Sequence, residues 1–286
     1  MSALLTGLAD STGFDPRGCE AFVGTSAGSI VAASLANGVE PHARLGELPE
    51  QPAVPEAESS DGDSYAAARA LQVATAVGRA TAAPFAALGL RASEPGGALL
   101  RRAALSRVPA GRRSLGGLGE RFDKRGAGWD GRLLVATVEL TSGRRVMFGA
   151  PDAPAASVGQ AVEASCAIPG VFHPIEIGGR RYVDGGAWSG TNMDAAPTRR
   201  GTRVLCLNPT GALRLPLRSP FGAFAALSRS LAAVEVLALE RHGAKVKNIA
   251  PDTGSAAAMG SKLMDPELRP QVIAAGLAQG RALAAN

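Results

Sequence analysis

The chain has 286 residues, which is enough for one large domain with a sizeable core. Its hydrophobic fraction is 46% but its aromatic fraction is only 4%, so Ala, Leu and Val dominate and a helix-rich α/β protein is favoured over an all-β one. The net charge of +5 is compatible with contact to anionic surfaces, and no stretch approaches the ~18 apolar residues that a membrane-spanning helix needs.

Hydrophobic periodicity and turn signals divide the chain into alternating helices and strands. In chain order these are a helix over 2–10, a strand over 21–23, a helix over 29–37, helical stretches over 65–90 and 99–122, strands over 132–139 and 145–148, a helix over 158–166, strands over 181–183 and 203–207, a helix over 221–242, a strand over 245–250 and a helix over 266–285.

This alternation predicts an α/β fold with three α/β/α layers and a mainly parallel central sheet. We interpret residues 1–286 as a single domain. Residues 41–63 are rich in Pro, Glu and Ser and predict an exposed loop. The helical stretches that follow predict a cap or insertion at about 64–125.

Charge is distributed unevenly along the chain. Residues 47–63 carry six acids, and residues 101–125 carry eight Arg or Lys against two acids. A solvated surface explains both runs, and contact with an anionic membrane is the functional alternative for the basic one. Because only Phe122 interrupts the basic run as an aromatic, nucleic-acid binding is not expected.

The three cysteines, Cys19, Cys166 and Cys206, are scattered and odd in number. They form neither a disulfide framework nor a metal-ligand pattern, so we expect free thiols in a reducing compartment and no metal or cofactor. The first five residues lack a basic segment and a long apolar run. We therefore predict no signal peptide and a cytoplasmic location, with possible peripheral membrane contact.

The run Gly24-Thr25-Ser26-Ala27-Gly28 fits the pattern G-x-S-x-G. In that pattern a strand turns sharply into a helix, and the corner residue points its side chain outward. Flanking glycines remove Cβ atoms that would collide, and the helix end aims free N–H groups at the corner. The pattern predicts Ser26 as a nucleophile, although a tightly packed strand-to-helix turn has the same appearance.

A nucleophilic serine needs a base, and His42, His173 and His242 are the chain's only histidines. His42 and His242 have no motif around them, whereas His173 is close in sequence to Asp184 and stays open as an alternative base. Asp184 ends a strand-like run and is followed by Gly185 and Gly186, which let the backbone turn away from its carboxylate. Most Asp-Gly-Gly triplets are plain turns.

Three segments together resemble the patatin-like phospholipase family in order and spacing. They are Gly24-Thr25-Ser26-Ala27-Gly28, Glu163-Ala164-Ser165-Cys166-Ala167-Ile168-Pro169-Gly170-Val171-Phe172 and Gly179-Arg180-Arg181-Tyr182-Val183-Asp184-Gly185-Gly186. The resemblance runs from about residue 5 to about residue 210. The C-terminal part, with Pro251-Asp252, Asp265-Pro266 and Gln279-Gly280, is similar to a bacterial branch of the same family.

The resemblance implies a lipid acyl hydrolase, of the phospholipase A or esterase type, with Ser26 as nucleophile and Asp184 as base. Ser26 would attack an ester carbonyl and form an acyl-enzyme, which water then hydrolyses. The motif positions at the site are Gly24, Ala27, Gly28, Gly185 and Gly186. The implied partner is a lipid or another acyl ester.

The family normally opens with a strand and a glycine-rich loop whose N–H groups form much of the oxyanion hole. Residues 1–10 resemble the helix that usually follows this loop, so we expect an N-terminal truncation. Ala27 N–H, assisted by Gly28, would be the remaining donor, and losing one donor typically costs about 10²–10³ in rate. The alternative reading is therefore a catalytically impaired relative or a lipid-binding protein.

Overall fold

The computed structural model describes residues 1–46, 94–211, 220–260 and 265–285. Its helices are α1 (Ser2–Thr12), α2 (Ala27–Ala36), α5 (Glu94–Leu105), α6 (Leu118–Asp123), α7 (Val158–Cys166), α8 (Pro220–Arg241), α9 (Thr253–Met259) and α10 (Arg269–Ala282). Its strands are β1 (Phe22–Gly24), β2 (Leu133–Glu139), β3 (Arg145–Phe148), β4 (Ile175–Ile177), β5 (Arg180–Asp184), β6 (Arg203–Leu207) and β7 (Lys245–Ile249).

Most predicted elements are confirmed, some to the residue. Helix α7 has the predicted bounds, because a capping box of Ser157 and Gln160 begins it. Helix α1 continues beyond its predicted end at residue 10 and is closed by a left-handed Gly13. Strand β4 and helix α9 were not predicted, and the stretch 106–117, expected to be helical, is not helical. The first part of the predicted cap at about 64–125 lies outside the described residues, which resume at residue 94, and its second part contains α5 and α6.

The expectation of a mainly parallel central sheet is not met. The main sheet has the order β1-β2-β5-β4, with β3 also paired to β2. Only β1 and β2 run parallel, while β2–β3, β2–β5 and β4–β5 are antiparallel. The physical reason is connection length: short turns join β2 to β3 and β4 to β5, and a short turn can join only antiparallel neighbours. The α/β class stands, but the sheet is mixed.

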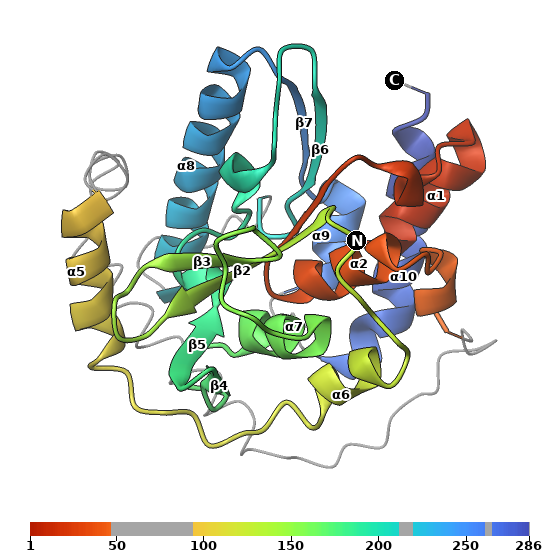
Figure 1. Ribbon diagram of the computed structural model, residues 1–286. Helices are drawn as coiled ribbons and strands as arrows, with labels where there is room; N and C mark the ends of the chain where they lie inside the picture. Colours follow the sequence, from red (N-terminus) through yellow and green to blue (C-terminus); the bar gives the residue numbers. More distant parts are fainter. Residues whose placement is uncertain (47–93, 212–219, 261–264, 286) are drawn as a thin grey trace.

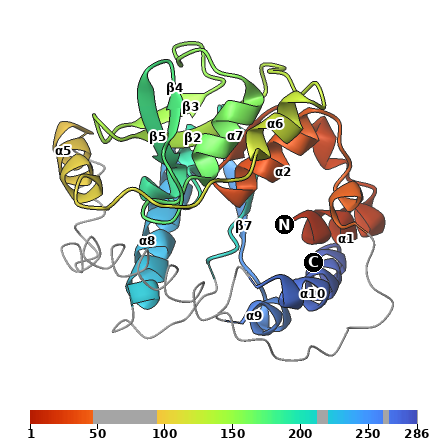
Figure 2. The same ribbon diagram turned by 90° about the horizontal axis from the view of Figure 1, so that it is seen from below.

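Helices α2 and α7 cover one face of this sheet. Ala33 of α2 and Val162 of α7 pack with Val135 of β2 in the largest core cluster. In the same cluster, the rings of Phe148 and Tyr182 meet edge to face with centroids 5.1 Å apart. On the opposite face, a smaller cluster includes the last residue of α5, and Figure 2 shows α5 across the strands from α2 and α7.

Two further units stand beside the main sheet (Figure 1). Strands β6 and β7 form a separate parallel pair that packs on α8 through Cys206 and Leu239. Helices α1 and α10 lie side by side, and α9 packs on α10. In the described ranges no helix combines the length and apolar character needed to cross a bilayer.

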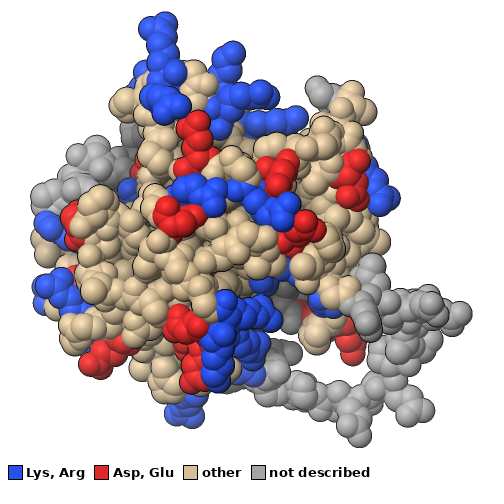
Figure 3. All heavy atoms as spheres, turned by 45° about the vertical axis from the view of Figure 1, so that its right-hand side comes forward, with Lys and Arg blue, Asp and Glu red and all other residues tan. Residues whose placement is uncertain are grey.

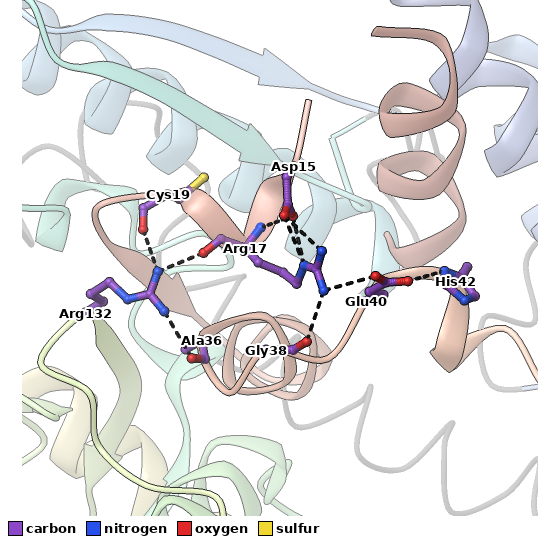
Figure 4. A network of polar contacts seen from close by, with 8 residues as sticks. All are labelled: Asp15, Arg17, Cys19, Ala36, Gly38, Glu40, His42 and Arg132. Carbon is purple, nitrogen blue, oxygen red and sulfur yellow. Dashed lines mark hydrogen bonds and ion pairs between the residues drawn. The ribbon is translucent and has the colours of Figure 1, made fainter. Parts of the chain in front are cut away.

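Arg132, just before β2, ties together the segments that lead into and out of the corner at Ser26 (Figure 4). Its guanidinium donates to the carbonyls of Arg17 at 2.8 Å, Cys19 at 3.0 Å and Ala36 at 3.1 Å. The Ala36 carbonyl belongs to the last turn of α2, where helix carbonyls lack intrahelical partners. The guanidinium also lies 5.2 Å from the centre of the Phe22 ring. One side chain therefore fixes the start of β1 and the end of α2.

We predict that Arg132→Ala lowers the free energy of unfolding by about 1–3 kcal/mol, since several carbonyls lose a charged donor. Urea unfolding followed by circular dichroism measures the change. Arg144→Ala is the matched control, because Arg144 also directly precedes a strand but is exposed. Equal stability of the two variants would contradict the structural role given to Arg132.

Candidate active site

Ser26 occupies a strained corner between β1 and α2. Its φ of 53° and ψ of −130° lie outside the usual regions for a residue with a side chain. The positive φ is not relieved by a glycine, so the surrounding structure must hold it. Ser29 helps, because its Oγ and its N–H both donate to the Ser26 carbonyl, at 2.6 and 2.8 Å. Such corners are found at nucleophilic serines.

The register of β2 explains why Ser26 and Asp184 meet. Gly24 pairs with Val135 on one side of β2, and Asp184 pairs with Thr137 on the other. Ser26 is two residues past Gly24 and thus level with Thr137, the partner of Asp184. The strands flanking β2 are about 10 Å apart, a distance that two side chains pointing toward each other can span.

Asp184 is 5% exposed, and the Ser26 hydroxyl hydrogen-bonds to its carboxylate. Removal from water raises the pKa of Asp184 to about 6, against the lowering effect of the hydrogen bonds from Ser26 and from Gly186 N–H. The Gly186 N–H lies 2.7 Å from Oδ1. The structure thus brings the two predicted residues together and gives the carboxylate a pKa close to neutrality.

Close backbone approach explains two of the motif glycines. A Cβ at Gly24 would lie 2.4 Å from Ser29 Cα, and a Cβ at Gly185 would lie 2.4 Å from the Ala136 carbonyl oxygen. Real Cβ atoms do not come so close, so either substitution would push β1 from α2 or the Asp184 turn from β2.

The two proposed oxyanion donors differ in the structure. The Gly28 N–H already donates to the Thr25 carbonyl at 2.8 Å, so it is engaged in the corner itself. The Ala27 N–H, at the exposed start of α2, has no hydrogen-bond acceptor among the described residues. Ala27 is therefore the better donor at this helix end, and the assistance expected from Gly28 is not seen.

The structure does not bring a histidine to Ser26 among the contacts of the described residues. His173 is exposed, and its backbone N–H donates to the Arg113 carbonyl. His42 pairs with Glu40, and the ring of His242 contacts the Ala238 carbonyl. The carboxylate of Asp184 is thus the group that the structure places against the serine.

Sequence reasoning missed two side chains that hold the corner. Ser165, in α7 and fully buried, accepts the Ser26 N–H at 2.9 Å and donates to the Ala136 carbonyl at 2.7 Å. Asn192, also fully buried, donates to the Thr25 hydroxyl at 3.1 Å. Ser165 was visible in the second motif segment, but nothing in its neighbourhood indicated which backbone groups it would bridge.

The basic run 101–125 does not form one uniform charged face. Arg101 donates to the carbonyls of Ala187 and Gly143 and stacks 3.9 Å above the centre of the Trp188 ring. Its guanidinium is therefore engaged in contacts within the protein. Lys124 pairs with Glu120. Figure 3 shows Lys and Arg side chains gathered at the top of the molecule, toward the start of β6 and β7.

A G-x-S-x-G corner between a strand and a helix of an α/β fold is an arrangement that occurs in acyl hydrolases. The family model described as patatin-like phospholipase matches residues 17–197, more than half of the chain, and this range includes every residue of the site. The chain belongs to the patatin-like phospholipase family, a family of lipid acyl hydrolases. No curated protein matches the chain.

Burial of Asp184 has a cost that depends on pH. The folded-state pKa of about 6 exceeds the ordinary 3.8, so the folded protein holds the proton more tightly than the unfolded chain. Well below pH 3.8 both states are protonated and no stability is lost. As pH rises through 6 the folded state loses up to about 3 kcal/mol.

We therefore predict that the stability of Asp184→Asn relative to the unmodified protein increases between pH 4 and pH 7, because Asn does not ionise. Urea unfolding at both pH values measures this difference, and Asp152→Asn, at an exposed aspartate outside the site, is the control. A difference that stays constant across the range would show that the carboxylate has an ordinary pKa.

Proposed function

We propose that the chain is a lipid acyl hydrolase that uses Ser26 as nucleophile and Asp184 as its base. The observation that carries the proposal is the hydrogen bond between the Ser26 hydroxyl and a buried carboxylate with a raised pKa. Membership of the patatin-like phospholipase family supports the lipid substrate class. The strained corner supports a nucleophilic role, since strain of this kind concentrates at functional sites.

In the proposed reaction, Asp184 accepts the hydroxyl proton as Ser26 Oγ forms a bond to the ester carbonyl carbon. The carbonyl oxygen becomes negative and is stabilised by the Ala27 N–H and the positive end of α2. The intermediate then collapses, the ester C–O bond breaks, and the departing alcohol takes the proton from Asp184. Water attacks the acyl-enzyme with Asp184 again as base, which releases the fatty acid and restores Ser26.

A carboxylate of ordinary pKa is a weak base at neutral pH. Raising the pKa of Asp184 to about 6 strengthens it as a proton acceptor while most of it stays ionised at pH 7 to 8. The Ser26 hydrogen bond orients the proton toward the carboxylate before the ester arrives. Burial therefore serves the chemistry at the expense of stability, as the pH dependence of unfolding is expected to show.

We predict that a fluorophosphonate probe labels the protein and that Ser26→Ala abolishes the labelling, because the probe reacts only with an activated serine hydroxyl. Gel fluorescence and mass spectrometry of the labelled peptide measure the result. Ser34→Ala is the matched control, since Ser34 is a buried serine of the same helix region without a contact to Ser26. Labelling that persists in Ser26→Ala would refute the proposal.

We also predict that kcat/KM for a chromogenic acyl ester rises with pH with a midpoint near 6. Below that pH Asp184 is protonated and cannot accept the Ser26 proton, so the sign of the dependence follows from the raised pKa. Stopped-flow or plate assays from pH 4.5 to 8.5 give the profile. In Asp184→Asn the residual rate should be lower and this rising limb should vanish, whereas a limb that remains would assign the titration to another group.

Contact with a membrane stays a prediction, and so does the alternative that the chain is a catalytically impaired relative of the family. If the protein is not labelled by the probe but sediments with anionic vesicles at low salt, it is a lipid-binding relative rather than a hydrolase. If it is labelled and also sediments, the basic residues serve to bring the enzyme to its substrate.

A further inference from the structure

The loop that follows Asp184 contains a fully buried polar residue to which the reaction assigns no role. Asn192 is 0% exposed and has a left-handed backbone, with φ of 47°. Asparagine tolerates this conformation better than most residues. A buried amide must satisfy both its oxygen and its nitrogen, so its contacts show what it connects.

The neighbours of Asn192 fix which way its amide points. Arg145 Nη1 lies 3.2 Å from one end, and because a guanidinium only donates, that end must be the oxygen. The nitrogen then faces the Ser189 carbonyl at 2.6 Å and the Gly185 carbonyl at 3.2 Å, and carbonyls only accept. A flipped amide would lose all three contacts.

The same nitrogen also reaches the nucleophile corner. It lies 3.1 Å from Thr25 Oγ1, and Thr25 is the residue directly before Ser26. Because the amide has two N–H groups for three acceptors, one N–H is shared between two of them. Gly185 is the residue directly after Asp184. The Asn192 amide therefore bridges the neighbour of the proposed nucleophile and the neighbour of the proposed base, which are about 160 positions apart in the chain.

Charged side chains on both sides hold the Asn192 loop in place, one of them buried and two partly exposed. Glu235 of α8 is fully buried and accepts hydrogen bonds from the Thr191 hydroxyl and from the Met193 N–H, the residues on either side of Asn192. Arg145, which contacts the Asn192 oxygen, also forms an ion pair with Asp194 at 2.8 Å. These contacts leave the amide little freedom, and a group held in this way can set the position of its partners.

We propose that Asn192 is a positioning residue that sets the placement of Ser26 against Asp184 by bridging Thr25 and Gly185. This inference rests on the proposed Ser26–Asp184 reaction and adds a residue to it. Asn192 touches neither the substrate nor the reacting atoms. Its effect is on how often the serine hydroxyl lies in line with the carboxylate, and small misplacements of reacting groups are costly.

The test compares Asn192→Gly with the unmodified protein. Glycine accepts a positive φ, so this variant removes the side chain without adding backbone strain. We expect the rate of fluorophosphonate labelling and kcat to fall about 10- to 100-fold while KM changes little, because positioning acts on the reacting groups. Asn208→Ala is the matched control: Asn208 is 3% exposed, contacts Thr210 and has no contact with the corner, so the labelling rate should be unchanged.

A double-mutant cycle isolates the bridge. Thr25→Val removes the acceptor hydroxyl at constant shape, and Thr25→Ser keeps it. We expect Thr25→Val to slow labelling, Thr25→Ser to retain it, and the combination of Thr25→Val with Asn192→Gly to be no slower than the worse single variant. If the loss of labelling rate in the double variant equals the product of the two single losses, the two residues act separately, and that result would overturn the proposal. If Asn192→Gly fails to fold by circular dichroism, the comparison of Thr25→Val with Thr25→Ser decides.

The outcomes separate the two proposals. An unmodified protein that the probe does not label, or one in which Ser26→Ala is still labelled, removes the proposed function and this inference with it. Labelling that needs Ser26 but proceeds at an unchanged rate in folded Asn192→Gly overturns the role of Asn192 alone. Slow labelling in Asn192→Gly with normal labelling in Asn208→Ala supports both.

Discussion

The register of β2 is the constraint on which the site depends. This strand pairs in parallel with β1 and antiparallel with β5, so that Ser26, two residues past the end of β1, and Asp184, the last residue of β5, arrive at the same level. A shift of one residue in either pairing would turn a side chain to the other face of the sheet. The packing of α2 and α7 on β2 and the Arg132 contacts at its start keep that register.

Around this register the structure places two costly features, a strained backbone at Ser26 and a buried carboxylate at Asp184. Hydrogen bonds from neighbouring residues offset the cost of each feature. Ser165 and Ser29 hold the corner, and the Gly186 N–H and the Ser26 hydroxyl bind the carboxylate. Asn192 connects the two groups of contacts. Such concentration of strain and burial at one place, with support from the surrounding fold, is what a preorganised reactive site requires.

The predictions from sequence succeeded where the signal was local. The bounds of α7 and the corner at Ser26 were predicted, and the structure shows a capping box at the start of α7 and glycines in close backbone contact at the corner. The prediction of a mainly parallel sheet was wrong, although the short stretch between the predicted strands 132–139 and 145–148 leaves room only for an antiparallel connection. Strand β4 was missed because Ile175–Ile177 is too short to show alternation before the Gly178-Gly179 turn. The candidate site residues Ser26 and Asp184 were named from motif spacing and family resemblance.

By itself the sequence determined the residue types at the site, the strand-to-helix corner, the α/β class and the family, because these depend on short runs of neighbouring residues. Only the tertiary structure decided that Asp184 lies against Ser26 while His173 does not, that Gly28 N–H is already engaged, and that Asn192 joins Thr25 to Gly185. The reason is physical. Pairing across β2 and burial against α7 and α8 are set by contacts between residues that are far apart in the chain. The order of residues in the sequence does not specify the distances between such residues in space.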